Sequence, residues 1–370
     1  MGKTIGLIFS GYGQQSVTMG KTLYDKKREV QDLFEQASMC LDINFVQLCF
    51  ASSSTELAEI DKGYVAILLL QTALYSQLAE IGVRPDFIAG YGIGEFAATV
   101  ASGSLSFADA LYLLHKYSKF MKDFFEQNQN LGILSLPRGF TKESLQALCQ
   151  SLSKEDKKIF IAAHNTESGF YVAGDKDLIE QLQDYCKMHE IRKVKELPVA
   201  YGMHSSLVDS IVTLLAPYFY KIDFKPLRYP VITNVDGVYV TSPDALESAI
   251  LRRINGPILW DELMDGFIGC DILICVGPGK QVAEWAALKY PEKAIYTIED
   301  LQDIKLLKEI LEKEEIEDKN IDDLNNILQV ADQDHSAVIL SQDLTIADEI
   351  NELSEDYDED ESDEIISRDE

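Results

Sequence analysis

The sequence predicts an α/β protein built on a parallel sheet, with a smaller β-α-β-β-α-β unit inserted into it and an acidic segment at its end. Short apolar runs alternate with longer helical patterns, which is typical of a parallel sheet covered by helices. Glycine-rich turns follow several of the apolar runs. Acidic side chains gather after residue 300.

Residues 1–128 are expected to form the first part of the larger domain. Its opening apolar run, Thr4–Phe9, is interpreted as a buried strand because it runs into the turn Ser10-Gly11-Tyr12-Gly13. Ser106 and Asp109 resemble a capping box at the start of a helix. The expected elements are strands at 4–9 and 86–89, and helices at 21–40, 64–81, 95–101 and 107–125.

Residues 129–197 have the rhythm of a ferredoxin-like subdomain. The pattern is strand, helix, two strands, helix and strand. The expected strands are 133–136, 159–163, 170–173 and 192–197, and the expected helices are 141–152 and 177–189. The larger domain resumes at 198–315, with helices at 205–218 and 281–289 and strands at 229–233 and 271–276.

Charge divides the chain into two parts. Of 62 acidic and 33 basic side chains, 25 acidic and five basic ones lie in residues 301–370, so most of the net charge of −29 lies there. We expect residues 316–370 to be a disordered tail, because its acidic runs hold few apolar residues. An acidic chain repels nucleic-acid phosphates, so nucleic acid is not an expected partner.

Cysteine usage and apolar runs favour a cytoplasmic protein. The six cysteines form no CxxC pair, which predicts reduced thiols and no metal site. No cofactor is expected. The apolar run Ile5–Phe9 is too short for a signal peptide. The longest uncharged stretch, Gly63–Ala79, is short for a membrane span and holds Gln71, so it is interpreted as a buried helix.

The turn Gly90–Gly94 has the frame of a nucleophile elbow. A strand, a turn with flanking glycines and a helix would hold the central side chain at a helix N-terminus, where free N–H groups stabilise an oxyanion. A working elbow carries Ser or Cys at its centre, and this chain carries Gly92. The pattern G-x-G-x-G by itself is equally typical of a plain glycine-rich turn.

Seven landmarks follow one another along the chain through about Glu314. They are Phe9–Gln15, Ala89–Glu95, Ile161–Asn165, Leu197–Ser205, Pro230–Val235, Pro257 with Trp260, and Gly277–Gly279. In this order they resemble malonyl-CoA:acyl carrier protein transacylases. The resemblance implies that family's acyltransferase fold, which is α/β-hydrolase-like with a ferredoxin-like insert.

The resemblance also implies which residues occupy the family's functional positions. Gly92 stands at the nucleophile, and His204 at the base. Neighbours within the landmarks are Tyr91 in place of a His, Ile93 after the nucleophile, and Asn165. Three further positions are changed: Tyr12 replaces an oxyanion Gln, Tyr117 replaces the carboxylate-binding Arg, and Arg253 replaces an active-site Gln.

Several of these residues admit two interpretations. His204 is either the retained base or a hydrogen-bonded turn histidine, and Asn165 either caps a turn or holds His204 or substrate. The tyrosines either fill a closed site or line a pocket for a neutral acyl chain. Arg253 either lies at the surface, where Arg252 and Arg253 would form a basic patch, or points inward and replaces the lost Arg.

Three functions follow from these alternatives. The first is a pseudoenzyme of fatty-acid or polyketide biosynthesis that binds acyl-CoA or an acyl carrier protein. The second is an active acyltransferase or thioester hydrolase, in which His204 activates water or another hydroxyl such as Ser10 or Ser16. The third is a structural subunit of a larger complex, with the acidic tail as adaptor. The resemblance leaves the oligomeric state open.

Overall fold

The computed structural model describes residues 3–313, and the residues up to Leu307 form one compact unit. A second unit begins at Lys308, and residues 301–313 are helical. The predicted tail at 316–370 lies outside the described residues. Within the described part of the chain, no helix combines the length and the apolar character needed to cross a membrane.

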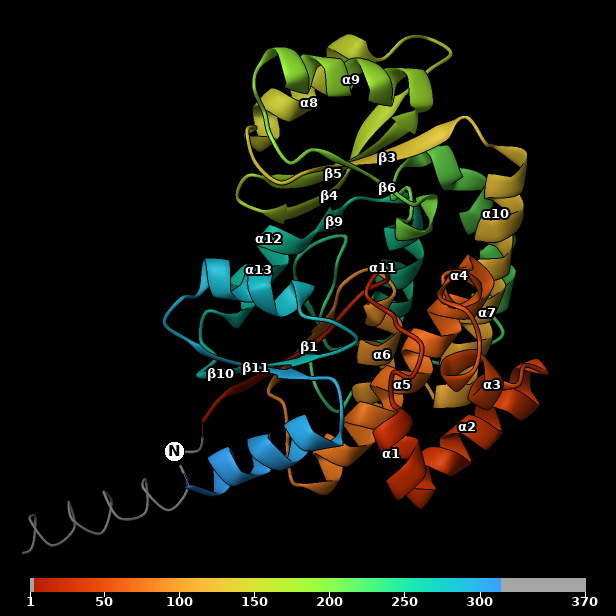
Figure 1. The fold of residues 1–370 in the computed structure, drawn as a ribbon, viewed down its shortest axis with the longest axis vertical. Helices are drawn as coiled ribbons and strands as arrows, with labels where there is room; N and C mark the ends of the chain where they lie inside the picture. The colour runs from red at the N-terminus through yellow and green to blue at the C-terminus, as the bar shows by residue number, and fades with distance from the viewer. Residues whose placement is uncertain (1–2, 314–370) are drawn as a thin grey trace, which may run out of the picture. The chain divides into compact units, whose positions relative to one another are not determined.

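A six-stranded sheet forms the centre of the first unit (Figure 1). Its order is β11-β10-β1-β2-β7-β8, and neighbouring strands are parallel except for β7 and β8. This sheet confirms the predicted α/β class. The strands are β1 Ile5–Phe9, β2 Phe87–Gly90, β7 Val231–Ile232, β8 Tyr239–Val240, β10 Ile272–Val276 and β11 Ala294–Ile298.

The register of this sheet brings three loops together. Phe9, the last residue of β1, pairs with Gly90 at the end of β2 and with Val276 at the end of β10. The carboxyl ends of these parallel strands therefore lie at one level, where ligands usually bind in open α/β sheets. The loops that begin at residues 10, 91 and 277 converge there.

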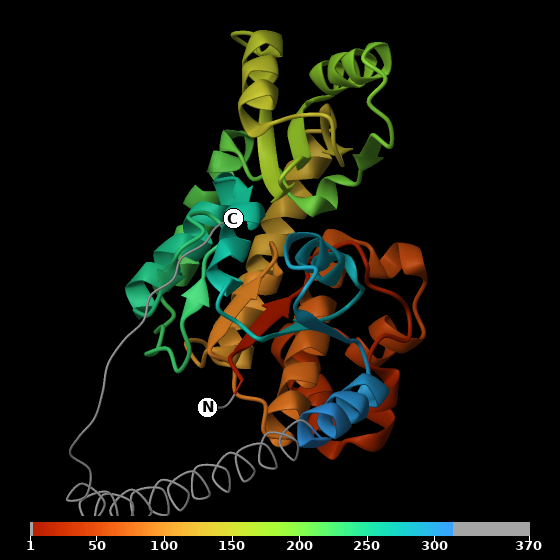
Figure 2. The same ribbon diagram turned by 90° about the vertical axis from the view of Figure 1, so that its left-hand side faces the viewer.

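Helices α5 (orange) and α6 contact the sheet at β10 and at β1 and β2, and α13 contacts β11 (Figure 2). Helix α5 is the central one, and every residue from Gly63 to Leu74 is buried. The helices are α1 Lys21–Lys26, α2 Arg28–Leu41, α3 Phe45–Phe50, α4 Ser54–Leu57, α5 Ile60–Glu80, α6 Gly94–Ala101, α7 Phe107–Gln127, α10 Asp209–Phe219, α11 Pro243–Asn255, α12 Trp260–Met264 and α13 Gln281–Lys289.

A second sheet, in the upper part of Figure 1, has the order β6-β3-β5-β4-β9. Helices α8 (Lys142–Leu152) and α9 (Lys176–Met188) bury an apolar core against it. Strand β9 (Ile258–Leu259) comes from outside residues 129–197 and pairs in parallel with β4, so this sheet includes a strand from the larger part of the chain. The other strands are β3 Leu131–Leu136, β4 Ile159–Thr166, β5 Gly169–Asp175 and β6 Lys195–Leu197.

Two expected helices differ in the structure. The helix expected at 21–40 is two helices, because the chain is extended at Lys27 between α1 and α2. The helix expected from Ser205 begins at Asp209, after a short 3-10 turn at Ser206–Val208. Ser205 has an extended backbone, so the helical backbone begins only after it.

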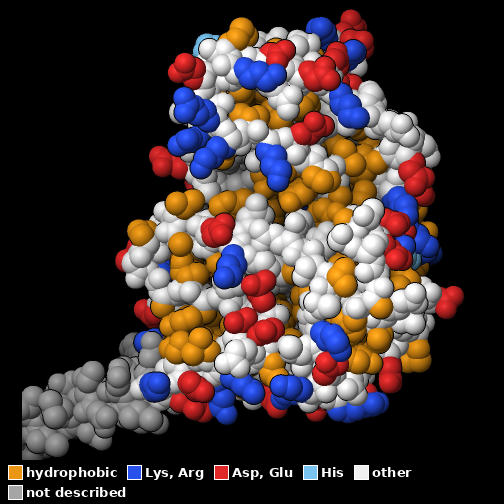
Figure 3. Space-filling view, viewed as in Figure 1, with side chains coloured by type: hydrophobic (Ala, Val, Ile, Leu, Met, Phe, Trp, Pro, Cys, Tyr) orange, Lys and Arg blue, Asp and Glu red, His pale blue; other side chains and the backbone are white. Residues whose placement is uncertain are grey.

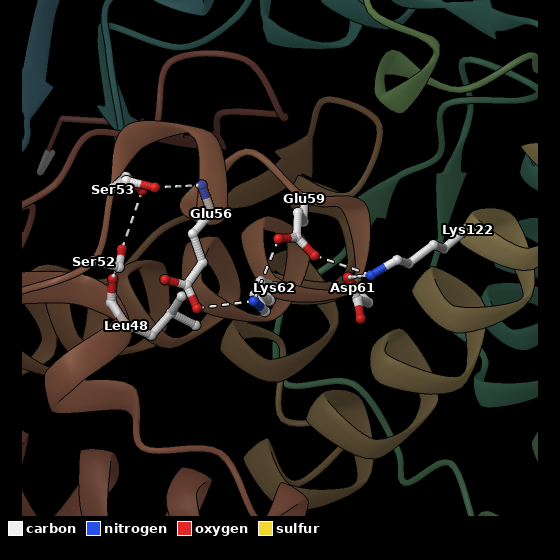
Figure 4. Close-up of polar contacts among 8 residues, drawn as sticks. All are labelled: Leu48, Ser52, Ser53, Glu56, Glu59, Asp61, Lys62 and Lys122. Atoms are coloured by element: carbon white, nitrogen blue, oxygen red, sulfur yellow. Dashed lines mark hydrogen bonds and ion pairs between the residues drawn. The ribbon is translucent and has the colours of Figure 1, made fainter. Parts of the chain in front are cut away.

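A network of ion pairs fixes the start of α5 against α7 (Figure 4). Lys122 lies 3.0 Å from Glu59 and 3.0 Å from Asp61, and Lys62 lies 2.8 Å from Glu56 and 3.4 Å from Glu59. About a third of each lysine side chain is exposed, so each pair stabilises the fold by well under about 1 kcal/mol. The network holds the segment whose backbone contacts the first loop of the site.

Candidate active site

The turn between β2 and α6 has the geometry of an elbow. Gly92 has φ +54°, and a Cβ at Gly90 would lie 2.1 Å from the backbone of Gly94, so strand and helix meet too closely for a side chain there. At Gly92 itself, a Cβ would meet only Ile258 Cδ1, at 3.6 Å. Position 92 therefore has room for a side chain, and the chain supplies none.

Asn234 holds this turn in place. Its Oδ1 accepts a 2.9 Å hydrogen bond from the Gly92 N–H, and its Nδ2 donates to the Gly90 carbonyl at 2.6 Å. Its own N–H donates to Glu95 Oε1 at 2.9 Å. Sequence reasoning missed Asn234 and Glu95 as site residues, although both belong to the quoted landmarks.

His204 is buried and oriented by a backbone carbonyl. Its Nδ1 lies 2.9 Å from the Arg253 carbonyl oxygen, an acceptor, so Nδ1 carries the proton and donates it. Burial, followed by the nearby Arg253 charge, lowers the pKa of His204 from 6.5 to about 4. A base with so low a pKa is uncharged at neutral pH and accepts a proton weakly.

Arg253 points inward and is fully buried, so it is not a surface cation. Its Nε lies 2.9 Å from Glu95 Oε2, and its guanidinium lies 5.7 Å from the ring centroid of Tyr117. The alternative in which Arg252 and Arg253 form a surface basic patch is therefore wrong. Arg252 forms a two-point contact with Asp236 at 2.7 and 2.6 Å. Burial raises the pKa of Glu95, and the Arg253 charge opposes this shift.

The Tyr91 ring contacts two tryptophans. Its ring makes edge contacts with Trp260 and Trp285 at centroid distances of 5.2 and 5.1 Å, and its hydroxyl donates to Asn165 Oδ1 at 2.8 Å. Asn165 thus holds Tyr91 rather than His204. Ile93, directly before α6, is buried as well.

Tyr12 closes the site from the first loop. Its hydroxyl donates to the Ala58 carbonyl at 2.6 Å, and its ring makes edge contacts with Tyr64 and Tyr201, each at 5.5 Å. Tyr64 in turn lies 5.9 Å from Tyr117. Burial raises the pKa of Tyr12 and raises those of Tyr64 and Tyr91 well above 10, so all three hydroxyls stay protonated and none is a phenolate nucleophile.

These rings form one continuous cluster over the converging loops, which we call the aromatic plug. Tyr171 completes it, with contacts to Tyr201 at 5.9 Å and to Trp285 at 6.4 Å. Its members are Tyr12, Tyr64, Tyr91, Tyr117, Tyr171, Tyr201, Trp260 and Trp285.

A cavity of about 440 Å³ lies outside the aromatic plug. Trp285 lines it together with Thr166, Leu288 and Lys289, whereas Gly92 and His204 do not. Trp285 therefore stands between this cavity and Tyr91.

The two serines named as alternative nucleophiles, Ser10 and Ser16, differ in their exposure to solvent. Ser10 is buried, and its Oγ lies 3.3 Å from Gln71 Nε2 of α5. Ser16 is exposed. Among residues 3–313, no group of three or more His, Cys, Asp and Glu side chains is placed to hold a metal ion.

Known proteins share both this sequence pattern and this fold. The family model described as "Acyl transferase domain" matches residues 7–252. The malonyl CoA-acyl carrier protein transacylase of Staphylococcus aureus (strain MRSA252) is 28% identical over 307 residues, covering 82% of this chain and 98% of its own. That of Bacillus subtilis (strain 168) is 27% identical over 314 residues, covering 84% and 98%.

Solved structures show the same architecture. A malonyl CoA-acyl carrier protein transacylase from Clostridium perfringens superposes with a TM-score of 0.79 at 24% identity, over 85% of this chain and 99% of the other. A malonyl-transacylase in complex with a type II PKS acyl-carrier protein gives 0.78 at 23% identity, over 83% and 99%. From the family match, which spans most of the chain, we conclude that this protein belongs to the acyl transferase domain family.

Proposed function

We propose that this chain is a malonyl-CoA:acyl carrier protein transacylase-like protein that has lost the transfer reaction and acts by binding an acyl carrier protein or acyl-CoA. The observation that carries the proposal is Gly92. The elbow around it has its tight glycines, its positive φ and its Asn234 contacts, yet no oxygen or sulfur stands at its centre. Loss of the nucleophile in such sites costs on the order of 10⁶ in turnover.

The electrostatics of the site oppose binding of a malonyl carboxylate. Tyr117 has no charge to offer, and the nearby Arg253 is already paired with Glu95 in a region that water does not reach. Glu95 faces Nε of Arg253, and within the described residues Nη1 and Nη2 make no hydrogen bond, so a second carboxylate there would share one positive charge with Glu95. Burying that second negative charge without a cation of its own costs several kcal/mol.

The aromatic plug opposes access to the turn. A thioester arm that enters the 440 Å³ cavity would meet Trp285, with the Tyr91 ring behind it. Opening this path would separate several packed aromatic pairs, each worth about 0.5–1.5 kcal/mol beyond its buried area. The plug therefore favours the interpretation in which the tyrosines fill a closed site.

Binding without turnover is supported by the likeness of the fold. One structural neighbour is a malonyl-transacylase in complex with its acyl-carrier protein, and the superposition covers 99% of that chain. A protein that keeps such a scaffold can keep a docking face after its reaction is lost. The alternative of thioester hydrolysis relies on His204, whose low pKa makes it a weak base.

Two measurements on the full chain test the proposal separately. Transfer of malonyl from malonyl-CoA to a holo-acyl carrier protein is expected to equal the rate without protein. The melting temperature is expected to rise with either the carrier protein or malonyl-CoA, because a ligand of the folded state stabilises it.

Each part of the proposal has its own contrary result. Transfer that His204→Ala abolishes and the exposed-histidine control His189→Ala preserves would show a working enzyme. A melting temperature unmoved by both ligands would remove the binding role and leave the loss of transfer standing.

A further inference from the structure

A second cavity, of about 620 Å³, lies behind the candidate active site on the other face of strands β4 and β9. Ile258 of β9 points toward Gly92, so its neighbours Pro257 and Leu259 face away, and both line this cavity. On β4, Asn165 faces Tyr91, whereas His164 lines the cavity. His164 and Leu259 are register partners, which places them side by side on the same face.

Two buried polar atoms at this cavity have no partner. His164 is 7% exposed and Ser205 is 5% exposed, and both line the cavity. Within the described residues, neither His164 Nε2 nor Ser205 Oγ makes a hydrogen bond. Buried polar atoms are rarely left unpaired in folded proteins, so each of these atoms points to a missing partner.

Glu262 fixes which ring nitrogen of His164 is free. Both oxygens of its carboxylate lie 3.0 Å from Nδ1, and the His164 ring stacks on Phe170 at a centroid distance of 4.6 Å. Burial alone would raise the pKa of Glu262, but hydrogen bonds from His164 and Lys142 outweigh it and lower the pKa to about 2. Glu262 is therefore ionised, Nδ1 donates to it, and Nε2 is left for a ligand.

A carboxyl group can form a hydrogen bond with Nε2 wherever the shared proton lies. If the proton is on the carboxylic acid, Nε2 accepts it, and if the proton is on Nε2, the carboxylate oxygen accepts it. The hydroxyl of Ser205 can donate to the second carboxyl oxygen.

The rest of the cavity lining combines apolar side chains, which suit an alkyl chain, with two lysines. Ile159, Ile161, Pro257 and Leu259 supply apolar wall, and a volume of this size is typical of a small-molecule site. Lys158 adds a cation, whereas the charge of Lys142 is paired with that of Glu262. Figure 3 shows Lys and Arg side chains gathered over the left side of the upper subdomain, interspersed with a few Asp and Glu.

We propose that this cavity binds a medium-chain alkyl carboxylate, with its carboxyl group between His164 and Ser205 and its chain along the β4–β9 wall. Gly92 does not line this cavity, so the proposal does not depend on whether the transfer reaction survives. His204, which stands at the base position, does line it.

Calorimetric titration and melting curves of the full chain with decanoate test this site. We expect saturable binding, with a melting temperature raised by about 4 °C at 100 times the dissociation constant. Ser205→Ala, which removes one hydroxyl, is expected to weaken decanoate binding by about tenfold. Lys158→Ala is expected to weaken it less, and Lys154→Ala, an exposed lysine outside the cavity lining, is expected to leave it unchanged.

Four results would overturn the proposal. Absence of saturable decanoate binding would remove the site. Equal binding of decanol would show that no carboxyl group is recognised there, and equal binding of decanoate to Ser205→Ala would show that Ser205 does not hold the carboxyl group. Binding of decanoyl-CoA without binding of decanoate would show that the ligand is a thioester, as expected for the separate proposal of acyl-CoA binding.

Discussion

At position 92 a glycine occupies a backbone conformation that many residues avoid, in a space that a side chain could enter. Sequence alone could locate this residue, because the strand, the flanking glycines and the following helix are local features. It could not show that Tyr91 and Tyr12 close the site. Their contacts reach Trp260, Trp285 and Tyr201, which lie far along the chain.

Burial of His204 is expected to make the free energy of unfolding depend on pH. Its pKa of about 4 lies below the 6.5 of an exposed histidine, so between these values the folded chain binds fewer protons than the unfolded chain. The free energy of unfolding is therefore expected to fall by about 3 kcal/mol as pH drops from about 6.5 to about 4. His115, with a pKa also lowered to about 4 mainly by burial, acts in the same direction.

Denaturant unfolding across this pH range measures the effect. His204→Gln is expected to flatten the decline, and the exposed-residue control His189→Gln is expected to keep it. A decline of the same size in His204→Gln and in the parent would mean that His204 is not the buried neutral group described above.

Between elements, the Glu95–Arg253 pair joins α6 to α11 in the interior. Replacing Arg253 by Met leaves a buried carboxylate without its partner, so the free energy of unfolding is expected to fall by about 3–5 kcal/mol. Adding Glu95→Gln is expected to restore most of this loss, because the amide oxygen can still accept from the Asn234 N–H.

The neighbouring pair provides the control, again by denaturant unfolding. Arg252→Met breaks a half-exposed contact with Asp236 and is expected to cost less than about 1 kcal/mol. Equal losses for Arg252→Met and Arg253→Met, or no recovery in the double variant, would contradict the account of a desolvated charge pair.

Elements with strong local signals were predictable, and those shaped by partners were not. The apolar helix α5 and the strands β1 and β10 follow from their apolar runs. Strand β9 has only two residues and exists because β4 lies beside it. The sequence around Arg253 does not predict that its side chain is buried either, since a basic residue near a helix end usually lies at the surface.

Across the whole molecule, the chain has the fold of an acyl transferase domain, and curated relatives align over 98% of their own length. The proposal adds that the reactive positions differ at residues 12, 92 and 117, where this chain has Tyr, Gly and Tyr. The sequence could predict this fold because seven landmarks along the chain resemble those of the family. The cavity behind β4 and β9 had no sequence signal, since its lining comes from three separate segments.

Intact-mass measurement after incubation with malonyl-CoA tests the central claim most directly. The unsubstituted chain is expected to keep its mass, because no nucleophile stands at residue 92. Gly92→Ser is expected to keep its mass as well, because Tyr117 offers no charge and the aromatic plug covers the turn. A stable gain of one malonyl group by the unsubstituted chain, lost in His204→Ala, would contradict the account.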